Sequence, residues 1–374
     1  MQGNLSGKKM FSRANEDMII YNEGTAMDAG EVTLSAWMRH WLEVYSRPYV
    51  GVSSHSAYCS LIYNHIAPAF SNILLKDLSL DILQRFFNQK AVGGRADVVK
   101  DPVTGKLVQK GGGLSLSTLT KMRMLILLAL DSAIDNSIVR TNVARKVRLR
   151  RERQPEVLIL TTSQQKKLEN VAMNDKRLLS FSILLALYTG LRIGEIAALR
   201  VDDIDLRGKT LHVKRSVKRV AVQGENTKTR IIMSEPKTEK GRRIIPLPDF
   251  LVRLLKKHIE DRRVFLQKMA VSHNAMDSGF LFVTKKGLGQ EQNQYRRHFS
   301  LILDKAGLGH YKFHALRHTF ASRCMEAGFD IKSLSDILGH TDAKMTIRIY
   351  THSLEDHKRK NMEKLTHIYN NRLK

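Results

Sequence analysis

Apolar residues recur every three or four positions in several segments of the first part of the chain. These segments are 33–45, 56–66, 79–89 and 117–136. Because this spacing places side chains on one face of a helix, each segment is predicted to be helical. Thr33 is the expected N-cap of the first helix, and Pro48 follows where its pattern stops. The pattern therefore predicts a small helical bundle over residues 31–145.

Residues 93–113 interrupt this helical pattern. The segment contains Gly93 and Gly94, a DPVTGK turn signal at 101–106, and three further glycines at 111–113. Glycine readily adopts turn conformations and weakens helices. We therefore expect a loop or a short hairpin inserted between two helices.

Beyond residue 155 the pattern mixes helices with strands. Thr161 and Gln164 have the spacing of a capping box, which predicts the start of a helix. The run 178–188 is apolar on nearly every face, as a buried helix is. Strand-like runs follow at 210–222, 230–233 and 243–247, and helical runs at 250–269 and from 290 onward. The fold class predicted for the chain is mainly α with a small antiparallel β-sheet (α+β).

The same pattern divides the chain into four parts. Residues 1–30 are polar, without a sustained period, and are expected to be an N-terminal extension. The helical domain at 31–145 is followed by a basic interdomain linker at 146–155. Residues 156–374 are expected to form a second domain that ends in a charged C-terminal tail.

The chain carries a large excess of positive charge. Lys and Arg total 62 against 36 Asp and Glu, which gives a formal net charge of +26 over 374 residues. Such an excess repels itself in a compact fold, and a polyanionic partner offsets the repulsion. An enzyme acting on small metabolites has no need of it. The composition therefore favours nucleic acid as the partner, with an acidic membrane surface as the second candidate.

The densest cluster of basic residues lies where the two predicted domains meet, in the run RKVRLRRER at 145–153. A short basic run is often only a solvated linker. At a domain boundary in so basic a chain, we expect it to contact nucleic-acid phosphates. The residues expected to make these contacts are Arg145, Lys146, Arg148, Arg150 and Arg151.

Cysteine and histidine usage argues against metal and disulfide sites. Cys59 and Cys324 are the only cysteines, neither lies in a CxxC, and no HExxH occurs. No apolar stretch is long enough to span a bilayer, and the first residues lack a hydrophobic signal region. We expect a protein without metal or cofactor in a reducing, cytoplasmic compartment, associated with the nucleoid of a bacterium.

Five short segments of the second domain carry side chains suited to chemistry on a phosphate. They are TGLRIGE, SEPKTEKGRR, HALRH, LGH and IYTH. In chain order they contain Arg192, Lys237, His314 with Arg317, His340 and Tyr350. Arg192 is expected at the start of a helix after a glycine turn, and Lys237 in the turn between two strand-like runs. His314 and Arg317 are expected one helical turn apart, and His340 just past a helix-ending glycine. Each residue taken alone is more simply a surface charge, an ion-pair partner or a packing residue. Their common order is what indicates a site.

These segments resemble the catalytic boxes of the tyrosine recombinase, or phage integrase, family. The resemblance covers about 160–355, and the helical domain at 31–145 resembles the family's core-type DNA-binding domain less specifically. It implies a site-specific DNA recombinase of a mobile element, such as a phage or an integrative transposon. Such an enzyme cleaves and rejoins DNA without metal or ATP.

The resemblance also implies a role for each residue. Tyr350 would attack the scissile phosphate and form a 3′-phosphotyrosyl link, releasing a 5′-hydroxyl. Arg192 and Arg317 would bind the non-bridging oxygens, a task for which the guanidinium fork is suited. Tyr311 and Tyr369 lack the spacing to LGH that Tyr350 has.

The remaining roles follow in the same way. His314 would donate to the phosphate or exchange a proton with the nucleophile, and His340 would donate to a non-bridging oxygen. Lys237 would protonate the leaving 5′ oxygen, with Lys240 in the same turn as its rival. Glu195 would orient the cations of the site.

Double-stranded DNA is the partner that the resemblance implies, bound by a homotetramer on synapsed sites. It leaves open whether DNA-bending or directionality factors take part. Three other interpretations remain: a Xer-like resolvase of chromosome dimers, a type IB topoisomerase and a non-catalytic DNA-binding regulator on the same scaffold.

Overall fold

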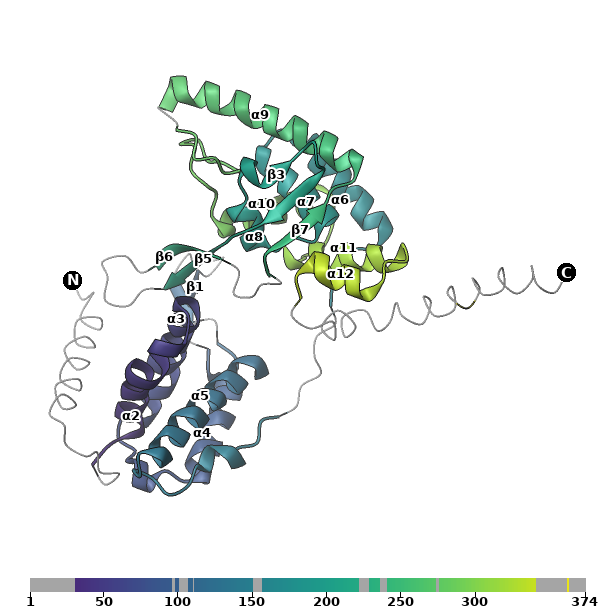
Figure 1. The fold of residues 1–374 in the computed structure, drawn as a ribbon. Helices are drawn as coiled ribbons and strands as arrows, with labels where there is room; N and C mark the ends of the chain where they lie inside the picture. Colours follow the sequence, from purple (N-terminus) through teal and green to yellow (C-terminus); the bar gives the residue numbers. More distant parts are fainter. Residues whose placement is uncertain are drawn as a thin grey trace. The chain divides into compact units, whose positions relative to one another are not determined.

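The computed structural model describes residues 31–95, 98–100, 107–109, 111–150, 157–221, 229–235, 241–273, 276–340 and 362. The chain divides into two compact units (Figure 1). The first unit comprises residues 1–154 with 220–229, and the second comprises 155–219 with 230–374.

The first unit is a helical bundle, as the apolar pattern predicts. Its helices are α2 (Leu34–Trp41), α3 (Val52–Leu61), α4 (Leu80–Gly93) and α5 (Leu116–Asp135). π-helical turns at Leu42–Ser46 and Ile62–Ile66 extend α2 and α3. The Thr33 side chain accepts a hydrogen bond from the Ala36 amide and caps α2, as expected.

Two tryptophans of α2 hold this helix against α5. Trp37 is 1% exposed, and its indole Nε1 donates to the carbonyl oxygen of Ala129 at 2.7 Å. Nε1 of Trp41 donates to the Ser132 hydroxyl at 3.1 Å. Each indole thus buries a large apolar area while its N–H keeps a partner, which fixes the register of the two helices.

The interruption predicted at 93–113 contains a short hairpin. β1 (Val98–Lys100) and β2 (Leu107–Gln109) pair antiparallel, with Val99 opposite Val108. The expectation of a loop or short hairpin between two helices is thereby confirmed.

The strands that follow residue 200 form two small sheets. β3 (Ile204–Asp205), β4 (Thr210–Val213) and β7 (Arg243–Pro246) form a three-stranded antiparallel sheet in the order β3-β4-β7. β5 (Ser216–Ala221) and β6 (Thr229–Ser234) form a two-stranded sheet. The sequence predicts one strand-like run over 210–222, and that prediction is wrong, because the run is two strands in different sheets.

A buried carboxylate accounts for the break between β4 and β5. Asp203 is 2% exposed and lies just before β3. Arg215 donates from Nη2 to both of its oxygens, at 2.6 and 2.7 Å, and Lys214 Nζ lies 3.4 Å from it. The two basic residues turn to this anion instead of continuing the pairing of β4.

Seven helices complete the described part of the second unit. They are α6 (Thr162–Asn174), α7 (Phe181–Thr189), α8 (Ile193–Ala198), α9 (Asp249–His273), α10 (Gln292–Lys305), α11 (His314–Glu326) and α12 (Ile331–Leu338). The predicted capping box of Thr161 and Gln164 opens α6. α7 is buried along nearly its whole length and packs against α6 and α11 (Figure 1). The predicted α+β fold class is confirmed.

No helix within the described ranges is both long enough and apolar enough to cross a membrane.

Candidate active site

The turn between α7 and α8 places Arg192. Gly190 ends α7 with φ +65°, and a Cβ at this residue would lie 2.5 Å from Phe320 Cδ1 and 2.7 Å from Leu338 Cδ2. Both the left-handed conformation and the close approach therefore require glycine. After this turn Arg192 occupies the N-cap position of α8, at the start of a helix as the sequence predicts.

Glu195 is the anion of the site. It is 7% exposed and accepts hydrogen bonds from the Arg192 amide at 2.9 Å and from Arg192 Nη1 at 2.8 Å. The Arg243 guanidinium donates to both of its oxygens, at 3.1 and 2.8 Å. Burial alone would raise the pKa of Glu195, but the bonds and charges of Arg243 and Arg192 outweigh it and lower that pKa to about 2. Glu195 therefore stays ionised and orients two guanidinium groups.

Arg317 is fixed inside the second unit. It is 3% exposed, and it donates from Nη1 to the Gly190 carbonyl at 2.8 Å and from Nη2 to the Leu338 carbonyl at 2.7 Å. A buried guanidinium needs such partners, since its charge is never lost. Arg317 consequently joins the α7–α8 turn to the end of α12.

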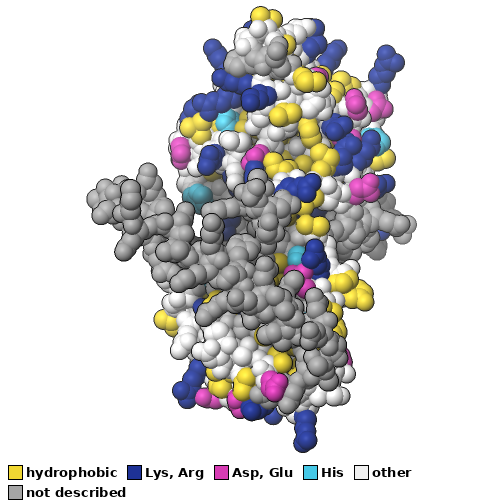
Figure 2. Space-filling view, turned by 90° about the vertical axis from the view of Figure 1, so that its left-hand side faces the viewer, with side chains coloured by type: hydrophobic (Ala, Val, Ile, Leu, Met, Phe, Trp, Pro, Cys, Tyr) yellow, Lys and Arg dark blue, Asp and Glu magenta, His cyan; other side chains and the backbone are white. Residues whose placement is uncertain are grey.

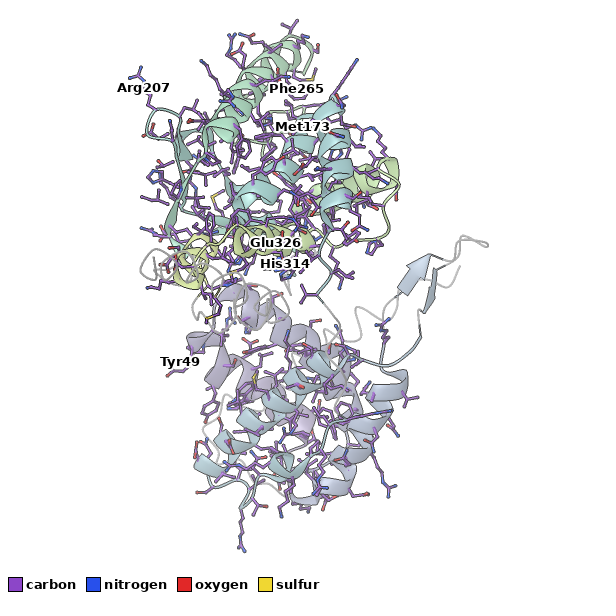
Figure 3. All side chains as sticks on the ribbon, turned by 90° about the vertical axis from the view of Figure 1, so that its right-hand side faces the viewer. Tyr49, Met173, Arg207, Phe265, His314 and Glu326 are labelled. Carbon is purple, nitrogen blue, oxygen red and sulfur yellow. The ribbon has the colours of Figure 1, made fainter. Side chains whose placement is uncertain are left out.

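His314 is the first residue of α11, whose ends His314 and Glu326 are labelled in Figure 3. It lies one turn before Arg317, as the spacing predicts, and its ring meets that of His318 edge-on at 4.6 Å. Burial, and then the charges of Arg317 and Arg192, lower the pKa of His314. The imidazole is therefore biased toward the neutral form, which can accept a proton.

Three arginines meet at the C-terminal end of α12. The carbonyls of Ile337, Leu338 and Gly339 accept from Arg243 Nε at 2.6 Å, Arg317 Nη2 at 2.7 Å and Arg192 Nη2 at 3.0 Å, respectively. These carbonyls have no partner within the helix, and the helix dipole makes this end negative. The arginines therefore supply hydrogen bonds to the last carbonyls of α12, and these carbonyls hold the three guanidinium groups close to one another.

His340 follows this helix end directly, as the LGH segment predicts. Gly339 has φ +65° and ends α12, and the His340 amide donates to the Ser335 carbonyl at 3.1 Å. The side chain is 5% exposed. Burial, and then the charges of Arg317, Arg192 and Arg243, lower the pKa of His340 to about 4.

The arrangement is suited to binding an anion. Arg192, Glu195, His314, Arg317 and His340 all belong to the second unit. The α7–α8 turn and the end of α12 link Arg192, Arg317 and His340, and His314 lies on the same helix as Arg317. The Arg192 side chain is 38% exposed, and its described side-chain bonds use two of its five N–H donors. It can therefore donate to a phosphate that arrives from solvent.

Two of the catalytic candidates, Lys237 and Tyr350, lie outside the described residues. The segment that contains Lys237 runs between β6 and β7, and these strands belong to different sheets.

The basic run is described as far as residue 150, so Arg151 lies outside. Val147 is 3% exposed in the core of the first unit, and the Arg148 amide donates to Gln84 Oε1 at 2.9 Å. The side chains that remain exposed are those of Arg145, Lys146, Arg148 and Arg150. Arg145 pairs with Asp131 at 2.9 Å. Lys and Arg side chains are spread over the face drawn in Figure 2.

Arg243 is the residue of this network that the sequence analysis misses. Its side chain is 6% exposed, and it is the first residue of β7. In the sequence, Arg243 is a basic residue directly before an apolar run, and this pattern indicated only a strand. Its partner Glu195 lies 48 residues earlier in the sequence.

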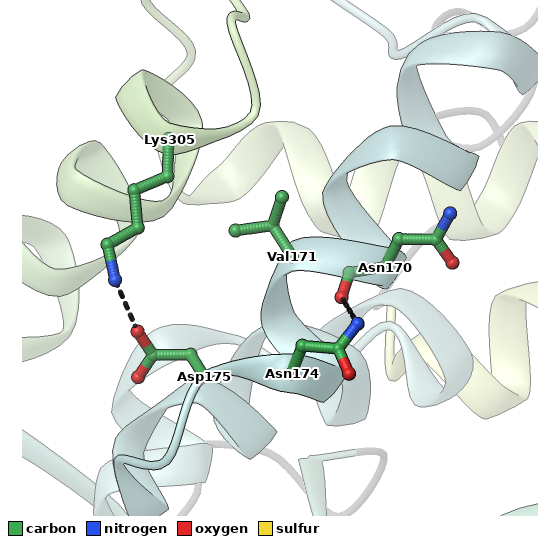
Figure 4. A pocket seen from close by; sticks show the side chains of 5 residues that line it. All are labelled: Asn170, Val171, Asn174, Asp175 and Lys305. Atoms are coloured by element: carbon green, nitrogen blue, oxygen red, sulfur yellow. Dashed lines mark hydrogen bonds and ion pairs between the residues drawn. The ribbon is translucent and has the colours of Figure 1, made fainter.

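A pocket lies away from these residues (Figure 4). It has a volume of about 320 Å³ and is lined by residues of α6 and α10 and by the residue that follows α6. These are Asn170, Val171, Asn174, Asp175 and Lys305. Lys305 pairs with Asp175 at 2.7 Å, and none of the candidate residues lines the pocket. Within the described residues, no group of three or more His, Cys, Asp or Glu side chains is placed to hold a metal ion.

Comparison with known proteins gives matches along most of the chain. The model of the phage integrase family matches residues 153–357, and that of the phage integrase N-terminal SAM-like domain matches residues 33–91. A protein of Caldanaerobacter subterraneus subsp. tengcongensis named tyrosine recombinase XerC-like is 28% identical over 374 residues, 97% of this chain and 90% of its own.

Two further proteins resemble this chain, one in sequence over part of its length and one in fold. The integrase of Staphylococcus phage L54a is 30% identical over 181 residues, 47% of this chain and 48% of its own. The structure of the Tn1549 transposon integrase in complex with transposon right end DNA has a TM-score of 0.69 at 21% identity, covering 90% of this chain and 100% of that one. By its family match, the chain belongs to the phage integrase family, the tyrosine-type site-specific DNA recombinases.

Proposed function

We propose that the chain is the integrase of a mobile element and that Tyr350 is its nucleophile. The observation that carries the proposal is the convergence of Arg192, Arg317 and His340 on the end of α12, with His314 one turn from Arg317. Two permanent positive charges and two imidazoles within one unit match the needs of phosphoryl transfer.

The proposed step is a transesterification. The Tyr350 hydroxyl oxygen bonds to the scissile phosphorus, and the bond from phosphorus to the 5′ oxygen breaks. His314 takes the tyrosine proton, and Lys237 gives a proton to the departing oxygen. The phosphotyrosyl link conserves the energy of the diester, so attack by another 5′-hydroxyl rejoins the DNA without ATP.

The arginines stabilise the charge that builds up on the non-bridging oxygens. Arg192 and Arg317 are fixed before the substrate arrives, so little reorganisation is needed in the transition state. His340 is held beside them by the end of α12 and donates to one of these oxygens. Glu195 keeps Arg192 in place and does not touch the substrate.

The protein is proposed to bind double-stranded DNA with both units. The helical domain at 31–145 and the catalytic domain at 156–374 would each bind the duplex, and the basic run from Arg145 to Arg151 would contact its phosphates. Exchange of two duplexes breaks four strands, and each protomer has one Tyr350. A homotetramer on synapsed DNA supplies the four nucleophiles.

A Xer-like resolvase of chromosome dimers is the second candidate. The relative named XerC-like matches 97% of this chain, which favours it. The phage integrase matches less of the chain at slightly higher identity, and the Tn1549 integrase shares the fold. The two candidates differ in substrate, since the first cleaves the ends of the element that encodes it and the second a chromosomal site.

The test is a covalent-adduct assay in EDTA. Purified protein is mixed with nicked duplexes that carry the ends of the encoding element, and an SDS-resistant protein–DNA band is sought. Wild type and Tyr311→Phe should give the band, because the Tyr311 hydroxyl is bonded to Gln164 at 3.2 Å. Tyr350→Phe should bind the DNA without forming it. A band from Tyr350→Phe, or tight binding by wild type without a band, contradicts the proposal.

A further inference from the structure

Arg243 and Glu195 form a buried ion pair whose partners come from different elements. Their side chains are 6% and 8% exposed, and the contact uses both guanidinium Nη atoms and both carboxylate oxygens. A buried pair gains from its charges only when its remaining polar atoms are also satisfied. Here Arg243 Nε donates to the Ile337 carbonyl, so the guanidinium is bonded on two sides.

Arg243 therefore joins three segments that are distant in sequence. It belongs to β7, its carboxylate partner belongs to α8, and its carbonyl partner belongs to the end of α12. Glu195 in turn accepts a hydrogen bond at Oε1 from Arg192. The end of α12 accepts a hydrogen bond from Arg317 and is followed directly by His340.

We propose that Arg243 is a positioning residue of the strand-transfer reaction, which holds Glu195 and the end of α12 so that Arg192 and His340 face the scissile phosphate. The proposal rests on the proposed function of the site. Arg243 itself does not touch the DNA, because its described bonds are all to protein groups and its side chain is buried.

The reason lies in how the hydrogen bonds to the two oxygens of Glu195 are shared between Arg243 and Arg192. Each oxygen has one bond from Arg243, and Arg192 supplies one bond from its amide and one from its side chain. Without Arg243 the buried carboxylate loses half of these donors, and it can replace them only by drawing the Arg192 guanidinium further inward. That movement takes donors away from the phosphate.

The adjacent residue supplies a matched control. Arg242 is 60% exposed and pairs with Glu235, which is 72% exposed, at 2.6 Å. Arg242→Met removes the same charge and the same side chain as Arg243→Met, one position earlier in the chain. Both variants lower the net charge equally, so a difference between them reports on the network and not on overall charge.

The experiment compares these variants in single-turnover adduct formation at saturating DNA, with the dissociation constant measured separately. Arg243→Met should slow adduct formation by about 100-fold or more, the size of loss seen when one oxyanion donor is removed, while the dissociation constant changes less than about threefold. Arg242→Met should match wild type in rate. Equal rates for Arg243→Met and Arg242→Met would overturn the proposal.

Arg243→Lys tests whether a slower rate comes from the lost contact and not from unfolding of the variant. It keeps the charge but cannot form the two-pronged contact, so its melting temperature should stay near that of wild type while its rate falls by about tenfold. A Lys variant with wild-type rate overturns the proposal. The double variant Arg243→Met with Glu195→Gln should be no slower than Arg243→Met alone if both act through one network. A double variant whose rate loss equals the product of the two single-variant losses also contradicts the proposal.

A readout without cleavage separates this proposal from the proposed function. Orthovanadate, a mimic of the transferring phosphate, is titrated calorimetrically into the full chain. Arg243→Met should bind it at least about tenfold more weakly than Arg242→Met does. That difference supports the positioning role even if wild type forms no covalent adduct, an outcome which would reject the proposed function alone. Equal affinities overturn the positioning role even if wild type cleaves DNA.

Discussion

Arg192 donates from Nη2 to the carbonyl oxygen of Gly339 at 3.0 Å, across 147 positions of sequence. The next residue is His340, so this one bond sets the distance between a candidate phosphate-binding guanidinium and a candidate imidazole donor. The glycine is needed because the chain turns there with φ +65°. The site thus depends on the end of a short helix.

The Gly190 turn should tolerate no side chain. Gly190→Ala adds a Cβ that clashes with Phe320 and Leu338, and it strains the left-handed backbone. Gly307→Ala has nearly the same φ, +64°, but nothing within 4 Å of the added Cβ. We expect about 1–2 kcal/mol of destabilisation for Gly307→Ala from backbone strain. Gly190→Ala should cost a further 1–3 kcal/mol, roughly, from overpacking.

The destabilisation of each glycine variant is measured as its free energy of unfolding in urea relative to wild type. Gly190→Ala should also slow adduct formation, since the Gly190 carbonyl accepts from Arg317. Equal stabilities for the two variants would show that the Gly190 turn is not constrained by Phe320 and Leu338.

Acid should weaken the second unit through Glu195. The pKa of Glu195 is lowered from 4.5 to about 2 in the folded protein, so its stabilisation is complete above pH 4.5 and is lost as the pH falls toward 2. The shift corresponds to roughly 3 kcal/mol. Glu195→Gln should therefore unfold more easily than wild type at pH 6. The difference should fall by roughly half at pH 3.5, where the unfolded carboxyl is already protonated.

This is measured as the free energy of unfolding in urea at the two pH values. Glu260→Gln is the control, because Glu260 pairs with Arg263 on the exposed face of α9 and should change little at either pH. A Glu195→Gln difference that stays constant with pH would mean that the folded and unfolded carboxyls titrate alike.

His340 should be neutral in the free protein at pH values where an ordinary histidine is charged. Its pKa is lowered to about 4, so protonation favours the unfolded chain, and the stabilisation from neutral His340 is lost as the pH falls from 6.5 toward 4. NMR of the imidazole nitrogens should show His340 predominantly neutral at pH 5.5. The signal is assigned by its absence from His340→Gln, and a midpoint near 6.5 would contradict the burial and the nearby charges.

The basic run should contribute to affinity on every DNA sequence. Changing Arg148, Arg150 and Arg151 to Ala should weaken binding to any duplex and flatten the dependence of log affinity on log salt by up to about 0.9 per lost phosphate contact. Arg263→Ala, on α9, is the control for lost charge alone. Fluorescence anisotropy between 50 and 300 mM salt, roughly, measures the slope. An unchanged slope in the triple variant would place the phosphate contacts elsewhere.

Local structure in this chain follows from local sequence. The Thr33 cap, the capping box at Thr161 and the glycine ends at Gly190 and Gly339 are all made between residues a few positions apart. They depend on short-range hydrogen bonds and on a left-handed φ, which particular residue types favour, so the residue types in the sequence indicate them. The helices, the hairpin within 93–113 and the placement of Arg192 and His340 at helix ends were predictable for this reason.

The strand pairing was less predictable. The run 210–222 is strand-like along its whole length, yet Asp203 pairs with Lys214 and Arg215, and the run is divided between two sheets. The segment holding Lys237 likewise lies between strands of different sheets. Pairing is decided by partners that are distant in sequence, so no periodicity reveals it.

The sequence by itself determined the family and the identity of the candidate residues, because their order along the chain is a property of the sequence alone. Only the tertiary structure decided how they are held. The carbonyls at the end of α12 lack partners within the helix, so they collect Arg192, Arg317 and Arg243 from three other elements. Arg243 looks in the sequence like a basic residue before a strand. It becomes part of the site because folding buries it against Glu195, where a charge must be paired.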